Sequence, residues 1–374
     1  MAIYLDYCAS TPVDPRVLQA MVDVYQNKPG NADSRTHIFG QQAKEVVNTS
    51  RKRISEILRI DPTEVIFTSG ATESDNTAII GLMDYGVSSG KKHIITTAIE
   101  HKAVLEAARY LEKRGFEIDY VNPDEKGRIH ADDVLKLVRK DTLLVSVMHV
   151  NNETGVIQPV SEIGDALSAG NVFFHVDAAQ SFGKLNDELR NLKYDMLSIS
   201  GHKIHGPQGI GALVLKRKAY KRPPIEPLFH GGPQEYGFRP GTIPVALVAG
   251  FAMAADLMEK EYPAKIQMLQ KQKDELVSAL LPYGMRINGD LDHSLPNVLN
   301  FSIPHIDAEA FFAAEKDLYA VSNGSACNSG SYKPSYVLQA MGYDEERIAE
   351  ALRVSWWDQP IDIKPLVRYV QDVQ

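Results

Sequence analysis

Short β-branched runs alternate with stretches of helical periodicity between about residues 60 and 215. The runs that predict strands are 65–67, 93–97, 116–121, 142–150, 172–176, 196–200 and 211–215. Helical spacing of apolar residues is found at 102–114, 131–139 and 161–168, and another helix passes through Ile79, Ile80 and Leu82. Because the strands are almost wholly apolar, helices must cover both faces of their sheet. The pattern predicts a large three-layer α/β/α domain around a mostly parallel sheet.

The remainder of the chain is less regular and predicts a smaller α+β domain. Residues 245–281 have a helical pattern, with a break expected at Pro263. The pattern then predicts a strand at 298–303 and helices at 308–314, 334–341 and 345–351. The Gly- and Pro-rich stretch 223–244 between the two regions is interpreted as an ordered loop.

Composition excludes several classes of protein. The chain has 374 residues, and 40 Lys+Arg against 48 Asp+Glu give a net charge of −8, which argues against broad binding to nucleic acid or anionic membranes. A single local basic patch would still be compatible with that total. Two cysteines, Cys8 and Cys327, cannot build a disulfide framework or a four-cysteine metal site. The N-terminal residues do not resemble a secretory leader, and no apolar run reaches the ~20 residues of a membrane span. We therefore expect a cytoplasmic protein in a reducing environment.

The segment Ser69–Ser74 follows a predicted strand and begins a predicted helix. Small residues there would let backbone N–H groups approach an anion at the positive end of the helix dipole. A plain capping box is the alternative, because Thr or Ser followed by an acid caps any helix.

Asp177 and Lys203 both come directly after predicted strands, where open α/β sheets bind their ligands. A lysine with a lowered pKa in such a place suits Schiff-base formation with an aldehyde. Asp177 would then keep a pyridine nitrogen protonated, so that the ring accepts electrons. A structural ion pair between the two residues is the simpler alternative. His202 and His205 could also be read as metal ligands, but no further cluster of ligands supports a metal site, and we expect none.

Cys327 lies in the small-residue stretch 322–331, rich in Gly, Ser and Asn. Isolated cysteines are most often inert core residues, and Cys8, among ordered neighbours, is interpreted in that way. Nothing near Cys327 in the sequence would bury it, and an exposed thiol on a loop can deprotonate and attack. Cys327 is therefore the candidate nucleophile.

Together these stretches resemble the cysteine desulfurases, pyridoxal-phosphate enzymes of the class V aminotransferase group. The small-residue loop is similar to that of the group I subfamily. The segments that carry the resemblance are 4–7, 70–76, 100–104, 149–155, 175–177, 200–203, 239–242 and 324–327.

The resemblance implies the fold and its division. The fold would be that of fold-type I pyridoxal-phosphate transferases, and the family forms homodimers with shared active sites. The large domain is expected at 16–256. The small domain would combine 1–15 with 257–374 and carry the loop 322–331.

The resemblance also assigns roles to particular residues. Lys203 would bind pyridoxal phosphate covalently, Asp177 would pair with its ring nitrogen, and His101 would stack on the ring and assist catalysis. Arg353 would bind the substrate carboxylate. The ring oxygen region would be held by Asn152, which also faces the substrate, and Gln180. The phosphate would be bound by Ala71, Thr72, Ser200, His202 and, across the dimer interface, Thr242.

The implied activity converts L-cysteine to L-alanine and leaves a persulfide on Cys327. That sulfur would pass to an acceptor protein, in iron–sulfur assembly or in sulfur modification of tRNA or DNA, with no direct contact to nucleic acid. The alternatives are a selenocysteine lyase or another pyridoxal-phosphate C–S lyase that does not need Cys327, and an inactive protein that only binds partners.

Three departures from the family pattern bear on the acceptor. Pro240 stands where many relatives have Ser, and Trp356-Trp357-Asp358 replaces a Leu-Gly type of sequence. The sequence also ends at Gln374, without the longer tail with which housekeeping members engage iron–sulfur scaffolds. These departures lead us to expect a dedicated acceptor, such as a DNA- or tRNA-modification system.

Overall fold

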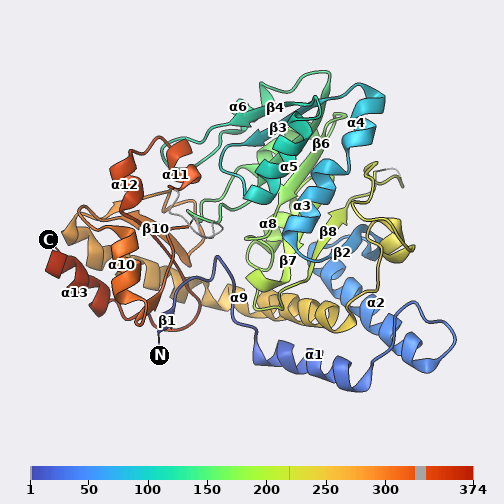
Figure 1. The fold of residues 1–374 in the computed structure, drawn as a ribbon, viewed down its shortest axis with the longest axis horizontal. Coiled ribbons are helices and arrows are strands. Elements are labelled where there is room, and N and C mark those ends of the chain that lie inside the picture. The colour runs from blue at the N-terminus through green and yellow to red at the C-terminus, as the bar shows by residue number, and fades with distance from the viewer. Residues whose placement is uncertain (1, 219, 325–333, 374) are drawn as a thin grey trace.

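A seven-stranded sheet forms the centre of the larger half of the molecule (Figure 1). The computed structural model describes residues 2–218, 220–324 and 334–373. The strand order is β2-β8-β7-β6-β5-β3-β4, and only β8 runs antiparallel to its neighbours, which confirms a mostly parallel sheet. The strands are β2 (Val65–Thr68), β3 (His93–Thr97), β4 (Glu117–Val121), β5 (Thr142–Met148), β6 (Phe173–Asp177), β7 (Met196–Ser200) and β8 (Gly211–Leu215).

Helices cover both faces of this sheet, because successive strand residues point to opposite sides. Met196 packs in one apolar cluster with α3 (Ala71–Ile80) and α5 (Lys102–Glu112). Its neighbour Leu197 packs in the other cluster, with α2 (Ile38–Leu58) and α9 (Val245–Leu280). The three-layer α/β/α arrangement is thus confirmed. The other helices of this half are α1 (Pro15–Asn27), α4 (Met83–Ser89), α6 (Ala131–Leu135), α7 (Val160–Leu167) and α8 (Asn186–Asn191).

The smaller half is built on a three-stranded antiparallel sheet in the order β12-β10-β9. The chain's first residues join it, because β1 pairs with β11 and Asp6 forms a bridge to Ser355. The domain boundaries given above stay a prediction. The elements are β1 (Ile3–Tyr4), β9 (Arg286–Ile287), β10 (Val298–Ser302), α10 (Ala308–Glu315), β11 (Tyr319–Ala320), α11 (Tyr336–Ala340), α12 (Glu345–Ala349), β12 (Ala351–Ser355) and α13 (Lys364–Val373).

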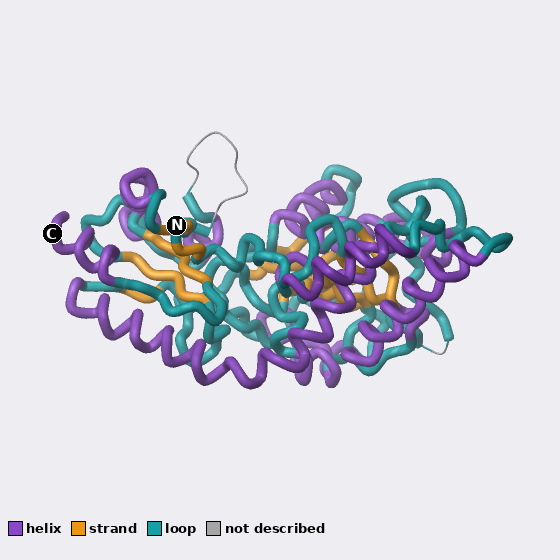
Figure 2. The backbone as a smooth tube through the Cα atoms, turned by 90° about the horizontal axis from the view of Figure 1, so that it is seen from below, coloured by secondary structure: helices purple, strands orange, loops and turns teal. Residues whose placement is uncertain are grey.

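The long helix α9 runs along both halves, and the break expected at Pro263 is wrong (Figures 1 and 2). Proline removes one backbone donor and favours a kink, but packing on both sides of it holds the helix. Tyr262 is 1% exposed and stacks on Trp357 of the smaller half, with ring centroids 6.1 Å apart. Leu269, further along, is fully buried. Burial before and after Pro263 therefore outweighs its local cost.

Other predicted boundaries were also corrected by tertiary contacts. The helix expected over 345–351 ends at Ala349, because the next residues form β12 against β10. The helix expected over 131–139 ends at Leu135. The strand expected over 142–150 ends at Met148, where the chain turns to line a cleft. Helices α1 and α2 were not predicted.

One local basic segment does exist, although the total charge is negative. Residues 216–222 contain five Lys or Arg. Their tight turn, closed by a bridge between Lys218 and Lys221, exposes 95% of Tyr220. Lys218 is 2.8 Å from Asp195, so part of the charge is neutralised within the chain. The expectation of no direct contact to nucleic acid stays a prediction. Separately, no helix among the described residues is long and apolar enough to cross a membrane.

The loop 223–244 is held to the large sheet by a buried ion pair. Arg51 donates two hydrogen bonds to Glu235, at 2.8 and 2.5 Å, and the N–H of Phe67 donates a third at 2.7 Å. The Arg51 side chain is 7% exposed and that of Glu235 is 1% exposed. Glu235 adopts a left-handed backbone conformation (φ 48°), so this pair fixes the loop against local strain.

We expect Glu235→Ala to lower the free energy of unfolding by about 3–5 kcal/mol, because it leaves the Arg51 charge buried and unpaired. Glu275→Ala is the matched control: its pair with Lys271 is exposed, and its loss should cost less than about 1 kcal/mol. Urea unfolding of both variants measures the difference. Equal losses would contradict the structural role given to Glu235.

Candidate active site

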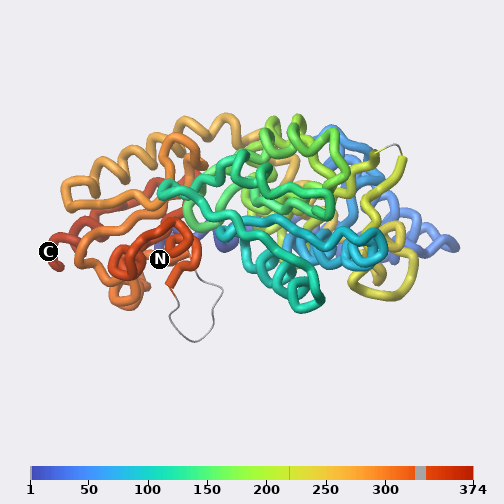
Figure 3. The backbone as a smooth tube through the Cα atoms, turned by 90° about the horizontal axis from the view of Figure 1, so that it is seen from above, coloured from blue at the N-terminus to red at the C-terminus, as the bar shows by residue number. Residues whose placement is uncertain are grey.

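A cleft of about 540 Å³ at the carboxyl ends of the parallel strands is lined by residues of both halves. Figure 3 shows the backbones of the two halves side by side. Asp177 ends β6, Ser200 ends β7, and Asn152 follows β5. The smaller half contributes Arg353 of β12. The predicted site residues that line this cleft are Ala71, Thr72, His101, Asn152, Asp177, Gln180, Ser200, His202, Lys203 and Arg353.

Two predicted residues are not in this group. Thr242 is exposed and does not line the cleft. Its segment is nevertheless tied to the cleft's rim, because Arg239 Nε lies 3.1 Å from Glu73 Oε1 and Glu73 lines the cleft. Cys327 lies outside the described residues. Gly324, three residues before it, lines the cleft.

Lys203 is held by backbone carbonyls rather than by a carboxylate. Its Nζ donates to the carbonyl of Ala9 at 2.8 Å and to that of Cys8. Burial is the main cause that lowers the pKa of Lys203 to about 8, and the positive charge of Arg353 acts in the same direction. Among the described residues, Asp177 and Lys203 form no ion pair, so the simple structural pair is not observed. A buried amine that loses its proton near neutral pH is a suitable nucleophile.

Asp177 and His101 face the same cleft with fixed orientations. The Asp177 carboxylate accepts a hydrogen bond from the N–H of Ala179 at 2.8 Å, and burial raises its pKa. His101 is the N-cap of α5, where its Nδ1 accepts from the N–H of Ala103 at 3.2 Å. Burial lowers the pKa of His101, although the Asp177 charge opposes that effect. A neutral imidazole therefore lines the cleft together with a buried acid.

Behind Asp177 lies a second polar layer without net charge. His175 shares hydrogen bonds with Ser146 at 2.8 Å and Ser198 at 2.9 Å. Burial lowers the pKa of His175 to about 3, so its ring is neutral. Asp75, fully buried in α3 and 3.5 Å from His175, has a pKa raised well above its usual value by burial and by the Asp177 charge. Of these three residues, Asp177 is the one that lines the cleft.

The start of α3 offers backbone donors to the cleft. Gly70 is the N-cap, makes no side-chain cap and has a φ of 152°, a conformation that favours glycine. Glu73 accepts from the N–H of Ser69, the residue before the N-cap, at 2.8 Å. The plain capping box with a Ser or Thr cap is therefore not observed. The N–H groups of the first helical turn have no partner within the helix and suit an anion.

Three buried side-chain oxygen atoms of cleft-lining residues have no hydrogen-bond partner among the described residues. They are the Ser200 hydroxyl, the Asn152 Oδ1 and the Gln180 Oε1. Each such atom costs about 1–3 kcal/mol when it stays unpaired. A cleft with anion donors at one end, an acid at the other and unpaired amides between them suits a ligand with a phosphate, a basic ring and ring oxygens. The donor set thus fits pyridoxal phosphate.

The Arg353 guanidinium is almost fully buried and already partly engaged. Its Nη1 donates to the carbonyl of Asn152 at 2.9 Å and its Nη2 to Asp6 at 2.5 Å. Its Nε has no partner among the described residues. A carboxylate that enters the cleft would meet a fixed cation there.

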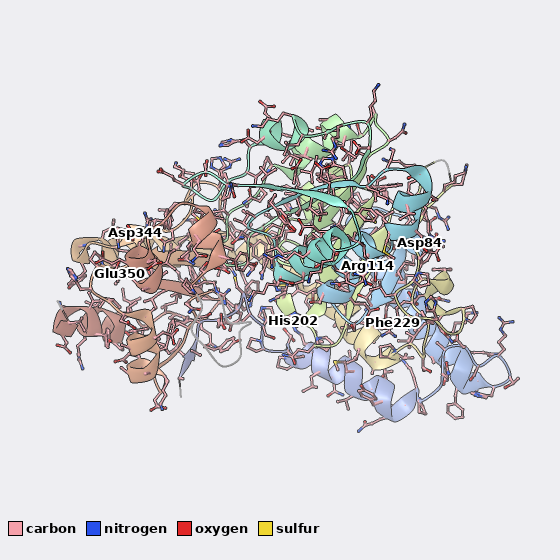
Figure 4. All side chains as sticks on the ribbon, turned by 45° about the horizontal axis from the view of Figure 1, so that its top comes forward. Asp84, Arg114, His202, Phe229, Asp344 and Glu350 are labelled. Atoms are coloured by element: carbon pink, nitrogen blue, oxygen red, sulfur yellow. The ribbon has the colours of Figure 1, made fainter. Side chains whose placement is uncertain are left out.

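The two histidines of the lysine loop do not support a metal site. His202, labelled in Figure 4, lies with its Nδ1 3.4 Å from the Ser10 hydroxyl, whereas His205 Nδ1 lies 3.1 Å from the carbonyl of Pro12. Burial lowers the pKa of His202 to about 4. Within residues 2–218, 220–324 and 334–373, no three His, Cys, Asp or Glu side chains are placed to hold a metal ion.

The sequence analysis missed the part of the cleft that comes from the chain's beginning. Cys8, Ala9 and Ser10 line it, and the carbonyl of Cys8 also accepts from Gln180 at 2.9 Å. Cys8 is 4% exposed and packs with Val150, in agreement with its interpretation as a buried residue. The resemblance included residues 4–7, but their pairing with the C-terminal part is a long-range contact that no local pattern contains.

Comparison with known proteins agrees with this geometry. The family model "Aminotransferase class-V" matches residues 3–356. The chain is 46% identical to cysteine desulfurase IscS of Escherichia coli, over 95% of this chain and 88% of that protein.

This chain belongs to the cysteine desulfurases of the class V aminotransferase family. DndA from Streptomyces lividans, a solved structure, is 46% identical with a TM-score of 0.83, over 95% of this chain and 99% of that one. SspA, solved in complex with cysteine, is 36% identical with a TM-score of 0.84, over 96% and 99% of the two chains. Both neighbours support the α/β fold of pyridoxal-phosphate enzymes that the sequence predicts, and enzymes of this family depend on that cofactor.

We expect the cofactor-free protein to react with pyridoxal phosphate at a rate that rises as the pH increases through about 8 and then levels off. The reason is that only the neutral Lys203 amine attacks an aldehyde, and its neutral fraction reaches one half at its pKa and approaches one above it. The change in absorbance after mixing, followed from pH 6 to 10, measures this rate. Lys203→Arg should show no such reaction. A midpoint near 10.5, the value of an ordinary lysine, would contradict the effect of burial.

Proposed function

We propose that this chain is a cysteine desulfurase that converts L-cysteine to L-alanine and carries the removed sulfur on Cys327. The observation that carries the proposal is the convergence of ten predicted site residues on one cleft, in a chain 46% identical to a named cysteine desulfurase. The solved relative in complex with cysteine supports the substrate.

In this proposal the cleft holds pyridoxal phosphate between its polar groups. The N–H groups of Ala71 and Thr72, with Ser200 and His202, would bind the phosphate, and Asp177 would pair with the ring nitrogen. His101 would stack on the ring, and Asn152 and Gln180 would hold the region of its oxygen. The bound cofactor supplies an aldehyde that takes the substrate amine, and a protonated ring that accepts electron density from the substrate.

The residues of the chain then divide the work on the substrate. Arg353 binds the carboxylate of L-cysteine and so fixes the Cα–H bond toward Lys203. The Lys203 amine, with its pKa near 8, takes the Cα proton. The neutral ring of His101 and the uncharged layer behind Asp177 leave that carboxylate as the counter-charge for a ring cation.

Sulfur transfer is assigned to the Cys327 thiolate. It attacks the sulfur of the substrate, so that an S–S bond forms while the substrate's Cβ–S bond breaks. The electron pair of the broken bond stays on the carbon fragment, which takes up protons and leaves as L-alanine. Cys327 is left as a persulfide. The reactive thiol fits a reducing, cytoplasmic setting.

We also propose that the enzyme acts as a homodimer in which Thr242 of one subunit reaches the phosphate in the cleft of the other. Thr242 is exposed, while the contact between Arg239 and Glu73 holds its segment at the cleft's rim. That position supports a role toward a second copy rather than toward its own cleft.

The sulfur acceptor is proposed to be a protein of a dedicated modification system for DNA or tRNA. IscS and DndA are equally similar to this chain, at 46% identity, so similarity alone does not identify the acceptor. The proposal rests on the departures at Pro240 and at 356–358. Strong binding to the host's iron–sulfur scaffold, with efficient transfer, would contradict it.

Cys327→Ala should abolish both alanine production and protein-bound persulfide from L-cysteine, and still bind the cofactor. Cys8→Ala is the matched control: it keeps the backbone carbonyl that accepts from Lys203, and it should retain turnover. Alanine and persulfide are quantified together with the cofactor's absorbance. Equal turnover in Cys327→Ala would move the assignment to a selenocysteine lyase or another C–S lyase.

Arg353→Lys should raise the KM for L-cysteine about 10- to 100-fold, because an ammonium cannot form the two-pronged carboxylate contact. The cofactor content should not change. Arg347→Lys is the control in the same half: that side chain contacts Asn288 and Tyr343 and does not line the cleft. Steady-state kinetics with L-cysteine measure both variants. An unchanged KM in Arg353→Lys would contradict the role of Arg353 in substrate binding.

A further inference from the structure

Two residues that flank segment 325–333, Gly324 before it and Ser335 after it, both lie against the buried carboxylate of Glu153. Glu153 is 1% exposed and follows Asn152. On the C-terminal side of the segment, the Ser335 hydroxyl donates to Glu153 Oε2 at 2.5 Å. On its N-terminal side, Gly324 lies so close that an added Cβ would stand 3.0 Å from the same oxygen.

Each of these flanking residues is itself fixed. Ser335 is the N-cap of α11 and accepts from the N–H of Leu338 at 3.1 Å. Gly324 has a φ of 90°, and its N–H donates to the Ser322 hydroxyl at 2.9 Å. Ser322 in turn pairs with Arg353 in an antiparallel bridge.

Glu153 is fixed from the side of the cleft as well. Its N–H donates to Asn151 Oδ1 at 2.9 Å, and its carbonyl accepts from Asn300 at 3.1 Å. Arg353 donates to the carbonyl of Asn152, the neighbouring residue. The backbone of Asn152 and Glu153 is thus fixed to Arg353 and Asn300, while the Glu153 carboxylate meets both flanks of the segment.

We propose that Glu153 is a positioning residue for sulfur transfer: it fixes Gly324 and Ser335, and thereby the two ends of the segment that contains Cys327, relative to Arg353 and Asn152. This inference rests on the proposed function. Glu153 touches neither the substrate nor the cofactor in this assignment. Its effect is on the approach of the nucleophile, where a displacement of about 1 Å costs as much as 100-fold in rate.

A buried carboxylate is an expensive anchor, and its surroundings reduce that cost. Burial raises the pKa of Glu153, whereas the hydrogen bond from Ser335 and the charges of Arg353 and Lys102 lower it, with burial the stronger effect. An amide of the same shape could keep the bond from Ser335 but not the attraction to Arg353. Glu153→Gln and Ser335→Ala therefore remove different parts of the anchor.

The test measures persulfide formation in the cofactor-loaded Ser335→Ala, Ser335→Thr and Glu153→Gln variants. We expect Ser335→Ala to slow persulfide formation from L-cysteine about tenfold or more, with unchanged cofactor content and unchanged KM. Ser335→Thr, which keeps the hydroxyl, should restore the rate. Ser335→Ala should slow persulfide formation in the Glu153→Gln background as well, because the amide keeps the bond from Ser335 that this second substitution removes.

Asp307→Ala controls for the loss of a helix cap. Asp307 caps α10 in the same half of the molecule, where its side chain accepts from the N–H of Ala310 and not from a neighbour of Glu153. If Asp307→Ala slows persulfide formation as much as Ser335→Ala does, or if Ser335→Ala loses cofactor and thermal stability in proportion to its rate, the effect is structural and the inference is overturned.

A second measurement separates this inference from the proposed function. In a Cys8→Ser background, the rate at which iodoacetamide alkylates Cys327 should change in Ser335→Ala and stay as in the parent for Asp307→Ala. This rate does not depend on turnover. Loss of activity in Cys327→Ala, together with normal persulfide formation and normal alkylation in Ser335→Ala, would support the function and reject the role of Glu153.

Discussion

The burial of the Lys203 ammonium against two backbone carbonyls is the interaction on which the rest of the site depends. A buried cation needs compensation, and here the acceptors come from Cys8 and Ala9, nearly two hundred residues earlier in the chain. To place those carbonyls, the N-terminal segment must pass over the carboxyl ends of the parallel strands, where the cleft lies. The pairing of β1 with β11 and the bridge from Asp6 to Ser355 then carry the same segment into the smaller half. One lysine thus requires the two halves to meet at the ends of the parallel strands.

The neutral groups around the site are as important as its charges. His175 is kept uncharged by burial, and Asp75, beside it, has a pKa raised well above its usual value. A charged second layer would compete with Asp177 for any cation in the cleft, or would repel it. With that layer neutral, the field in the cleft is set by Asp177 at one end and by the start of α3 and Arg353 at others. The cleft therefore has a negative group, Asp177, and positive groups, Arg353 and the start of α3, at different places.

Local patterns predicted the large sheet well, because its central strands are buried and mostly apolar, and β6 and β7 end in the polar residues Asp177 and Ser200. They also placed Asp177 and Lys203 at one edge of the sheet, since strand ends at one edge are neighbours, whereas residues such as His101 and Arg353 came from the resemblance. They failed where distant packing decides the outcome. The continuation of α9 through Pro263 depends on Tyr262 and its partner Trp357, and β12 depends on its pairing with β10. The carbonyl of Cys8 could not be found from sequence, because any residue type supplies a carbonyl. Glu153, in contrast, was visible as an acid directly after Asn152, but only its contacts give it a role.

The departure at 356–357 has a structural meaning that follows from these contacts. Trp356 is 1% exposed, so it extends the core next to β12, the strand that carries Arg353. Trp357 lies between Tyr262 of α9 and His205, whose ring centroid is 4.8 Å away, and the Lys265 ammonium lies 5.3 Å from its ring centre. His205 is two residues after Lys203 and has a φ of 62°, so its backbone conformation needs such support. A Leu-Gly sequence at these positions would provide no aromatic ring for either contact. In this chain the two tryptophans therefore couple the strand of the substrate-binding arginine to the loop of the lysine through packing, in addition to the link through the N-terminal segment.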